Sequence, residues 1–189
     1  MKANTDTTDE ALLCKKAANG DQSARSQLYT RHAPAVFTLA LRMLCHRASA
    51  EEVLQDTFIK AFTRLDTFRQ DAKFNTWLRR IAVNECLQLL RSPWRQRAMV
   101  LDEVASPDLH KDHQIDLARA LGTLDPISRA VVWMHDVEGY THGEIARVMG
   151  RSVSFSKSRL ARGHVALRTV LEPESEASEC TPILGNSSH

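Results

Sequence analysis

Residues 141–160 read THGEIARVMGRSVSFSKSRL, and this stretch decides the fold of the second half of the chain. Thr141 and Glu144 have the spacing of a capping box, which marks a helix start, and the second glycine of the stretch is a common helix end. A short turn then leads to Ser152 or Ser154, either of which can cap a second helix. A helix, a short glycine-containing turn and a second helix are typical of a helix-turn-helix.

The second helix of this motif is strongly basic. Cationic side chains recur along it between apolar positions such as Leu160 and Leu167: Lys157, Arg159, Arg162 and Arg168. A basic helix directly after a short turn favours insertion into the major groove of DNA. Any αα-hairpin shares the same local signals, so the motif alone leaves a non-DNA function open.

Apolar residues recur at helical spacing through most of the remaining chain, and no stretch alternates as a β-strand does. Asp125, which precedes a proline, marks a helix start. Ser49 has Glu52 three residues on, which predicts a capped helix over 50–65. Pro34 is expected to start or bend a helix.

Composition divides the chain into five segments. Residues 92–113 contain prolines and acidic residues in place of the helical pattern and predict a flexible acidic linker. Residues 11–91 and 114–171 are the segments with helical periodicity. Residues 1–10 and 172–189 are polar and acidic, and we expect both to be disordered. The sequence therefore predicts an all-α fold of two small helical domains joined by the linker.

The formal net charge of +2 conceals a strong polarity along the chain. Residues 11–97 carry 15 basic and 7 acidic side chains, and residues 117–171 carry 8 and 4. The start, the linker and the tail are acidic and offset these two basic blocks. Two basic blocks favour a polyanionic partner, with nucleic acid the first candidate, although two ordinary solvated surfaces would give the same count.

Several other classes of protein have little support. The four cysteines are far apart and form no C-x-x-C motif: Cys14, Cys45, Cys86 and Cys180. Neither an apolar leader nor a membrane-length apolar run occurs, so we expect a cytoplasmic protein. His110 and His113 suggest a metal-dependent enzyme as one alternative, but catalytic motifs are missing and neither metal nor cofactor is expected.

Two further surfaces carry recognisable patterns. Arg80, Asn84 and Gln88 recur every four residues on a predicted helix over 76–91, after a polar, aromatic loop over 68–75. Amide and guanidinium groups can read bases or bind phosphate, and aromatic rings can stack on unpaired bases. Upstream, Glu52, Gln55 and Asp56 share a helix face that suits a protein partner. An ordinary solvated face remains the alternative in both cases.

Longer stretches together resemble one family. AEEVLQDTFIKAF at 50–62, LDTFR at 65–69 and FNTWLRRIAVN at 74–84 closely resemble region 2 of the extracytoplasmic-function sigma factors, which are small sigma-70-type initiation factors. LDPISR at 124–129, VEGYTHGEIA at 137–146 and SKSRL at 156–160 resemble region 4. The resemblance covers about residues 11–170, in the family's order and spacing.

The resemblance implies a role for three sets of residues. Those that match the surface docked on the β′ coiled coil of core polymerase are Glu52, Gln55 and Asp56. Those that match the reader of the −10 element, where a base is flipped from the non-template strand, are Phe68, Lys73, Asn75, Arg80, Asn84 and Gln88. Those that match the recognition helix in the −35 major groove are Lys157, Ser158, Arg159 and Arg162.

The implied function is that of a non-catalytic initiation factor. It binds core RNA polymerase through the β′ coiled coil and the β subunit, threads the linker through the polymerase, and binds promoter DNA at both elements while aiding −10 melting. Family members are often held inactive by an anti-sigma factor, which makes such a protein a candidate partner. The remaining alternative is a stand-alone helix-turn-helix regulator, which would bind a palindromic operator as a dimer without polymerase.

Two details depart from the family's usual recognition helix. Ser154-Phe-Ser156 stands in place of a Gly-Thr-Val-like entry, so we expect Phe155 to take over the inward packing of the usual aliphatic residue. Gly163 stands inside the helix, at a cost of about 1 kcal/mol relative to alanine. Both changes affect the expected −35 sequence preference.

Overall fold

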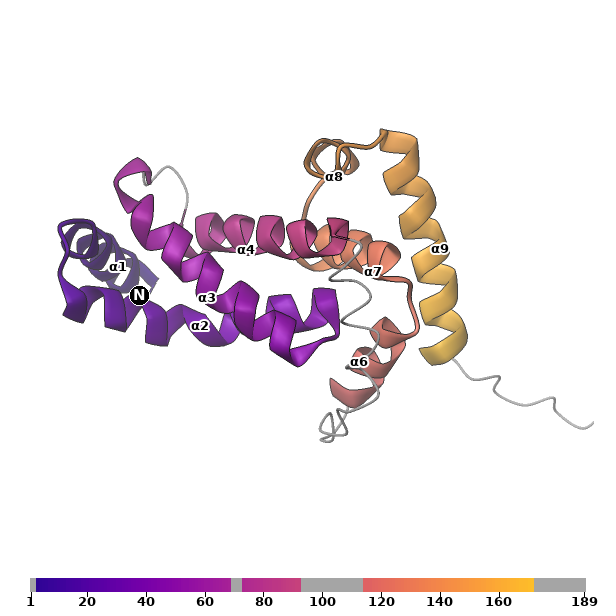
Figure 1. The fold of residues 1–189 in the computed structure, drawn as a ribbon, viewed down its shortest axis with the longest axis horizontal. Coiled ribbons are helices and arrows are strands. Elements are labelled where there is room, and N and C mark those ends of the chain that lie inside the picture. Colours follow the sequence, from indigo (N-terminus) through magenta and orange to yellow (C-terminus); the bar gives the residue numbers. More distant parts are fainter. Residues whose placement is uncertain (1–2, 69–72, 93–113, 172–189) are drawn as a thin grey trace, which may run out of the picture.

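The computed structural model describes residues 3–68, 73–92 and 114–171, and every regular element within these ranges is helical. Figure 1 shows two groups of helices that follow each other along the chain, the first indigo to magenta and the second orange to yellow. The expected all-α fold with two small helical domains is therefore confirmed. The predicted linker, apart from Ser92, and the predicted tail lie outside the described residues.

In the part of the first domain that the structure describes, there are four α-helices and one 3₁₀ turn. Their bounds are α1 Ala3–Ala18, α2 Gln22–Leu44, α3 Arg47–Thr63, η1 Leu65–Thr67 and α4 Phe74–Arg91. Helix α2 packs against α1, α3 and α4. The largest fully buried side chains at the centre are Leu28, Leu39, Met43, Phe74 and Leu78. Burial of each contributes about 1.5–3 kcal/mol, and this packing fixes the position of α4.

The N-terminus differs from the expectation that residues 1–10 are disordered. Helix α1 begins at Ala3, well before the apolar residues that signalled a helix. Two contacts to α2 tie down its middle: Asp9 pairs with Arg31 at 3.2 Å, and the Glu10 carboxylate lies 2.8 Å from Nε2 of His32. Partners more than twenty residues away supply these contacts, so the local composition could not predict them.

Helix α2 is longer than predicted because Pro34 does not interrupt it. The helix runs unbroken from Gln22 to Leu44 with the proline inside, and the proline side chain is exposed. Buried residues on both sides of Pro34, such as Leu28 and Leu39, pack against the neighbouring helices. This packing outweighs the cost of about 3 kcal/mol that proline imposes inside a helix.

The start of α3 also differs from the prediction. The predicted cap was Ser49, but the helix begins at Arg47 and its N-cap is His46. The His46 Nδ1 accepts the Ser49 amide at 3.1 Å and lies 2.8 Å from the Ser49 hydroxyl. Ser49 therefore lies in the first turn of α3 and forms hydrogen bonds with the N-cap residue, His46.

The cysteines occupy the positions expected of small core or boundary residues. Cys14 and Cys86 are buried, Cys45 is half-buried, and all three are free thiols. Burial raises the pKa of Cys14 to about 11 and raises that of Cys86 further still. Neither buried thiol is therefore a nucleophile at neutral pH. Cys180 lies outside the described residues.

The second domain contains the predicted helix-turn-helix. Its elements are α6 Gln114–Gly122, α7 Pro126–Val132, the π-helical turn η3 Trp133–Val137, α8 His142–Met149 and α9 Val153–Leu171. Asp125 caps α7, and the capping box of Thr141 and Glu144 starts α8, as predicted. Gly150 ends α8 with a positive φ of 64°, and the Ser152 hydroxyl accepts the Phe155 amide to start α9.

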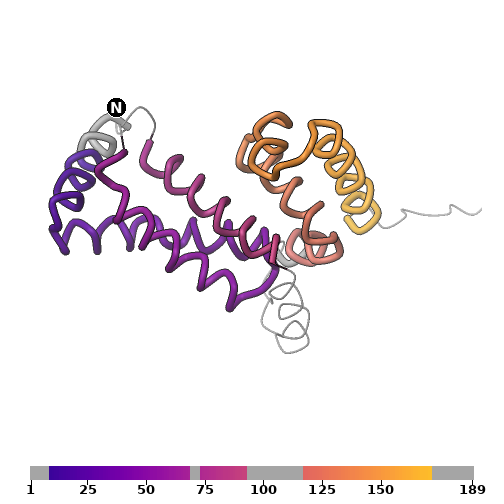
Figure 2. Tube along the Cα trace, turned by 45° about the horizontal axis from the view of Figure 1, so that its top comes forward, coloured from indigo at the N-terminus to yellow at the C-terminus, as the bar shows by residue number. Residues whose placement is uncertain are grey.

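The two domains pack against each other. Helix α7 contacts α2 and α4, and the buried apolar residues of both domains form one continuous cluster. The views in Figure 1 and Figure 2 both place the orange helices beside the end of α4. Residues 128–134 are buried all around, because α9 covers one side of this segment and the first domain covers the other.

Candidate nucleic-acid interface

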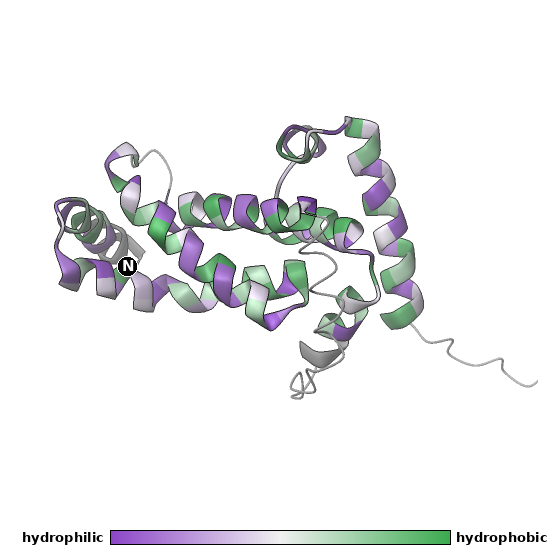
Figure 3. Cartoon of the chain, in the orientation of Figure 1, coloured by the Kyte–Doolittle hydropathy of each residue, from purple (hydrophilic) through white to green (hydrophobic). Residues whose placement is uncertain are grey.

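Helix α9 presents one face to its own domain and another to solvent. Ser156, Leu160 and Gly163 are buried at the spacing of successive helical turns. Figure 3 shows hydrophilic and hydrophobic residues interleaved along α9, as this division requires. Three of the four predicted −35 residues are exposed: Lys157, Ser158 and Arg162.

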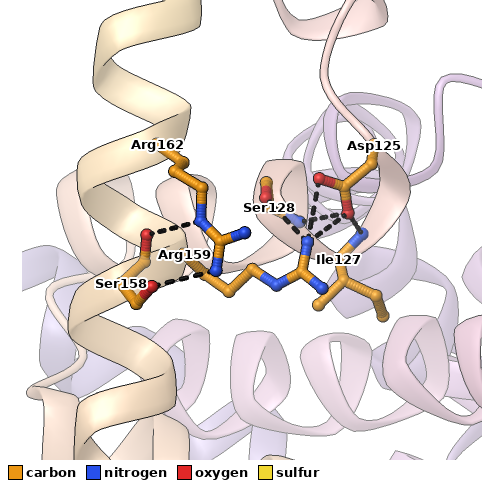
Figure 4. A network of polar contacts seen from close by, with 6 residues as sticks. All are labelled: Asp125, Ile127, Ser128, Ser158, Arg159 and Arg162. Atoms are coloured by element: carbon orange, nitrogen blue, oxygen red, sulfur yellow. Dashed lines mark hydrogen bonds and ion pairs between the residues drawn. The ribbon is translucent and has the colours of Figure 1, made fainter.

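Arg162 makes its contacts within α9. Its Nη2 donates to the Ser158 hydroxyl at 2.9 Å and its Nε to the Ser158 carbonyl at 3.3 Å (Figure 4). Both bonds are local and exposed, so they orient the guanidinium along the outer face at little energetic cost. This geometry leaves Arg162 available to a ligand approaching α9.

Arg159 points the other way, toward α7. Its Nη1 lies 3.1 and 3.2 Å from the two Asp125 carboxylate oxygens (Figure 4), and its guanidinium stacks 5.3 Å from the Phe155 ring centroid. Partial burial acts to raise the pKa of Asp125, but hydrogen bonds from Ser128 and the charge of Arg159 hold this pKa below its usual value. Arg159 therefore joins the recognition helix to the cap of α7.

The departure at Ser154-Phe-Ser156 has a structural explanation that differs from the expected one. Ser156 itself takes the inward position and is fully buried, with its hydroxyl 3.0 Å from Nδ1 of His142. Phe155 is only half-buried and lies between the guanidinium groups of Arg151 and Arg159. A polar pair joining α8 to α9 thus replaces the aliphatic contact, and Phe155 does not substitute for it.

Gly163 is required by close helix packing. A Cβ atom added there would lie 2.5 Å from Cγ2 of Val132 on α7, a separation that real Cβ atoms do not show. Helices α7 and α9 therefore approach more closely at this point than any side chain would permit. Gly163, which by helix propensity alone destabilises α9, is the residue at which α7 and α9 make close contact.

An aromatic cluster lies where α4 begins. Phe68 lies 5.7 Å from Phe74 and 5.2 Å from Trp77, measured between ring centroids. Beside it, Asn75 is half-buried, and its Oδ1 is buried without a hydrogen-bond partner among the described residues. Exposed Lys73 precedes the helix as its N-cap residue. The predicted loop is only partly visible, because residues 69–72 lie outside the described ranges.

The predicted stripe on α4 is exposed and faces the second domain. Arg80, Asn84 and Gln88 are all exposed. Asn84 and Gln88 line a crevice with Val148 of α8, and Arg80 lines a neighbouring crevice with Tyr140. The sequence located this stripe correctly on one helix face, but it gave no sign that α8 would lie opposite.

The predicted protein-binding patch lies on α3. Gln55 is exposed, while Glu52 and Asp56 are half-buried and line a crevice with Glu85 of α4. Ile59, one turn beyond Gln55, is 64% exposed and extends the patch with an apolar side chain. Sequence reasoning missed Ile59, although its spacing from Gln55 and Asp56 places it on the same face.

Sequence reasoning also missed two ion pairs that involve α4. Glu85 is buried, and its carboxylate lies 2.5 Å from Nζ of Lys60 on α3. Arg79 forms a two-pronged pair with Glu138, which follows η3 in the second domain. The signal for the pair of Glu85 and Lys60 was an acidic residue within a buried helix face. Nothing in the sequence connected Arg79 with Glu138.

The described residues contain neither a membrane-length helix nor a cluster of metal ligands. No helix within the described ranges is long and apolar enough to cross a membrane. Among the same residues, no group of three or more His, Cys, Asp or Glu side chains could hold a metal ion. His110 and His113, on which the metal-enzyme alternative depends, lie outside the part of the chain that the structure describes.

Comparison with known families matches each domain to one part of the same protein class. Residues 28–96 match the family model of Sigma-70 region 2, and residues 114–167 match that of Sigma-70, region 4. The matched ranges contain the aromatic cluster, the α4 stripe, the α3 patch and most of α9. The two matches occur in the order expected from the sequence resemblance.

Curated relatives cover nearly the whole chain. The chain is 31% identical to RNA polymerase sigma factor NccH of Alcaligenes xylosoxydans xylosoxydans, over 89% of this chain and 97% of the relative. It is 34% identical to the ECF RNA polymerase sigma factor SigM of Mycobacterium tuberculosis H37Rv, over 87% of this chain and 85% of the relative.

Solved structures agree with these relatives. The structure of CnrH in complex with the cytosolic domain of CnrY aligns with a TM-score of 0.54 and 32% identity, over 87% of this chain and 97% of that chain. The sigma factor RpoE of Bartonella quintana, solved with the anti-sigma factor NepR, shares the fold with a TM-score of 0.56 and 23% identity, over 79% and 98%. The chain therefore belongs to the sigma-70 family, as an extracytoplasmic-function factor that directs RNA polymerase to initiate transcription at promoters.

Proposed function

We propose that this sigma factor divides promoter recognition between its domains. The start and exposed stripe of α4 bind the melted −10 strand, the outer face of α9 enters the −35 major groove, and the α3 patch holds core polymerase on its β′ coiled coil. The factor performs no catalysis itself and acts in the cytoplasm, where core polymerase and promoter DNA are found.

The observation that carries the −10 assignment is the Oδ1 acceptor of Asn75, which has no partner among the described residues and lies beside the aromatic cluster. A buried carbonyl oxygen without a partner costs about 1–3 kcal/mol, and a base N–H that reached it would recover this energy. The neighbouring rings of Phe68 and Trp77 offer a surface on which an unstacked base can rest. The stripe of Arg80, Asn84 and Gln88 then continues along α4 for the following nucleotides.

For the −35 element, the exposed face of α9 supports contact by Lys157, Ser158 and Arg162. In this proposal Arg162 reads a base edge and Lys157 binds phosphate, in keeping with the usual division between specific and electrostatic contacts. Arg159 contributes by holding α9 against the cap of α7, through Asp125. Its role is therefore to position the helix that reads the DNA.

On α3, the patch suits a protein partner better than DNA. Glu52 and Asp56 are acidic and would repel phosphate, whereas Gln55 and the exposed Ile59 add an amide and an apolar contact. Binding to polymerase would tether both DNA-reading surfaces and raise their effective concentration at the promoter. Two of the similar structures hold CnrY and NepR, which supports a regulatory protein partner of the anti-sigma class for this chain as well.

Run-off transcription with purified core polymerase tests the proposal. Asn84→Ala should lower promoter-dependent initiation without changing the affinity for core, whereas Asp56→Ala should weaken core binding. Gln27→Ala, which alters another exposed amide near the N-terminus of α2, is the matched control and should leave both unchanged. Equal loss of core affinity in Asn84→Ala would contradict the division of roles. Tight operator binding by the free protein, with no initiation, would favour a stand-alone regulator.

A further inference from the structure

The packing of the two domains conflicts with simultaneous binding of both promoter elements. The −35 and −10 elements are separated by roughly 25 base pairs, which is about 85 Å along B-form DNA. In this structure the −10 stripe and the second domain instead line shared crevices, with Asn84 and Gln88 opposite Val148. The described arrangement is therefore a closed state, and the domains must separate before both elements are bound.

One ion pair connects the domains beside that stripe. Arg79 Nε donates to Glu138 Oε2 at 2.7 Å, and Arg79 Nη2 donates to the second oxygen, so the pair is two-pronged. The Glu138 side chain is 4% exposed, and its Oε1 also accepts the indole N–H of Trp133 at 3.0 Å. Three donors thus surround one shielded carboxylate, and removing one of them would leave a buried charge less well compensated.

The partner of Arg79 has the chemistry of a DNA phosphate. A carboxylate and a phosphate present the same pair of acceptor oxygens to the fork of a guanidinium group. Arg79 precedes Arg80 on α4, and both line one crevice with Thr76. We propose that Arg79 is a further contact for a phosphate of the melted −10 strand, and that Glu138 occupies this contact in the closed chain. This inference rests on the assignment of α4 to the −10 strand made above.

The first test compares Glu138→Gln and Arg79→Gln in the free full-length chain. The glutamine side chain introduced by Glu138→Gln would keep an acceptor for the Trp133 indole and nearly the same shape, so folding is preserved. Both variants should open the chain and raise its radius of gyration in small-angle X-ray scattering. The matched controls are Asp9→Asn and Arg31→Gln, which remove the same charges from the ion pair at the α1–α2 contact. These controls should leave the radius of gyration unchanged. A radius unchanged in Glu138→Gln would overturn the proposal.

The second test separates a phosphate contact from a simple latch. The probe is fluorescein-labelled oligothymidylate of about twenty nucleotides, because phosphate contacts need no sequence. Glu138→Gln should bind it about tenfold more tightly, since more of the chain is open. Arg79→Gln should lack most of this gain and should reduce the slope of log K against log salt by about 0.7, the value for one phosphate on a single strand. If the two variants bound oligothymidylate with equal affinity and equal salt dependence, the ion pair would only hold the domains together. That result would overturn the assignment of Arg79 as a phosphate contact.

The double variant Arg79→Glu with Glu138→Arg provides an independent check. The reversed pair should restore the compact radius of gyration while oligothymidylate binding stays weaker than in Arg79→Gln, because position 79 would then repel phosphate. A double variant as expanded as Glu138→Gln would show that the ion pair does not hold the closed state. Scattering and oligonucleotide binding need no polymerase, so they give an answer even if run-off transcription fails.

Discussion

Arg159 and Arg162 lie three residues apart on α9, yet they make different contacts. Arg159 reaches across to Asp125 and stacks on Phe155, while Arg162, among the described residues, forms hydrogen bonds within its own helix. Composition and helical spacing marked both as DNA-binding candidates, because both are cations on a basic helix. The distinction depends on a carboxylate 34 residues earlier in the chain, which sequence periodicity cannot connect to Arg159.

Alanine substitutions should separate these two roles. Arg162→Ala should weaken binding to −35 duplex DNA by about 1–3 kcal/mol and leave the free energy of unfolding nearly unchanged. Arg159→Ala should lower the free energy of unfolding by about 1 kcal/mol, since it leaves Asp125 without its partner. Urea unfolding and promoter binding by the holoenzyme measure the two effects. If Arg159→Ala reduced −35 affinity with full stability, the positioning role would be wrong.

The contact between α7 and α9 decides which residue α9 carries at position 163. Sequence reasoning counted Gly163 as a cost of about 1 kcal/mol, because glycine disfavours helix. The structure reverses that judgement, since Cγ2 of Val132 occupies the space of a Cβ atom. Valine is stiff at χ1 and cannot move aside easily, so the close approach of the helices fixes the glycine.

Gly163→Ala should therefore lower the free energy of unfolding by about 1–2 kcal/mol despite the better helix propensity of alanine. In a Val132→Ala background the clash disappears, and the same substitution should instead raise the free energy of unfolding by up to about 1 kcal/mol. Chemical denaturation of the four proteins in this cycle gives the coupling. If Gly163→Ala changed the free energy of unfolding in the same direction in both backgrounds, Val132 would not be what excludes the alanine side chain.

Helix starts show how far local sequence determines the elements. Asp125 and the pair of Thr141 and Glu144 were predicted correctly as caps, because all the hydrogen-bonding groups lie within three residues of one another. The cap of α3 was missed because a histidine ring took the role usually given to serine. Helix α2 was predicted in two parts because its continuity through Pro34 depends on tertiary packing.

At the scale of the whole molecule, acid should destabilise the second domain. Partial burial acts to raise the pKa of Asp125 and Asp136, but hydrogen bonds, with Arg159 beside one carboxyl and two histidines beside the other, hold both pKa values below the usual value. A pKa lowered by folding stabilises the native state above about pH 4, and this stability is lost as the pH falls through the native pKa.

Unfolding of the second domain should therefore become easier below about pH 4. Asp125→Asn should destabilise it at neutral pH and reduce the slope of the free energy of unfolding against pH in the acid range. Circular dichroism during urea titrations at several pH values measures this slope. Asp66→Asn, on the exposed turn η1, provides the matched loss of charge and should leave the slope unchanged. A slope unaltered in Asp125→Asn would contradict the assignment.

The division of charge along the chain predicted two basic domains. The family resemblance predicted which surfaces bind DNA and polymerase. Neither predicted how the two domains pack against each other. Features within each domain, such as the capping box and the apolar stripes, join residues that are close in the sequence. The pair of Arg79 and Glu138 spans 59 residues and joins two segments whose packing depends on the finished fold. Sequence spacing therefore located the candidate residues but not the contacts between domains.

The distance in sequence between Arg79 and Glu138 has a consequence during synthesis of the chain. Glu138 is made 59 residues after Arg79. At translation rates of about 5–20 residues per second, the delay is roughly 3–12 s. For most of this interval, once Arg91 has been made, the first domain is complete to the end of α4 while Glu138, the partner of Arg79, has not been made. Each new molecule therefore passes through a brief period in which the proposed −10 surface is open to any nucleic acid nearby, including the messenger RNA being translated.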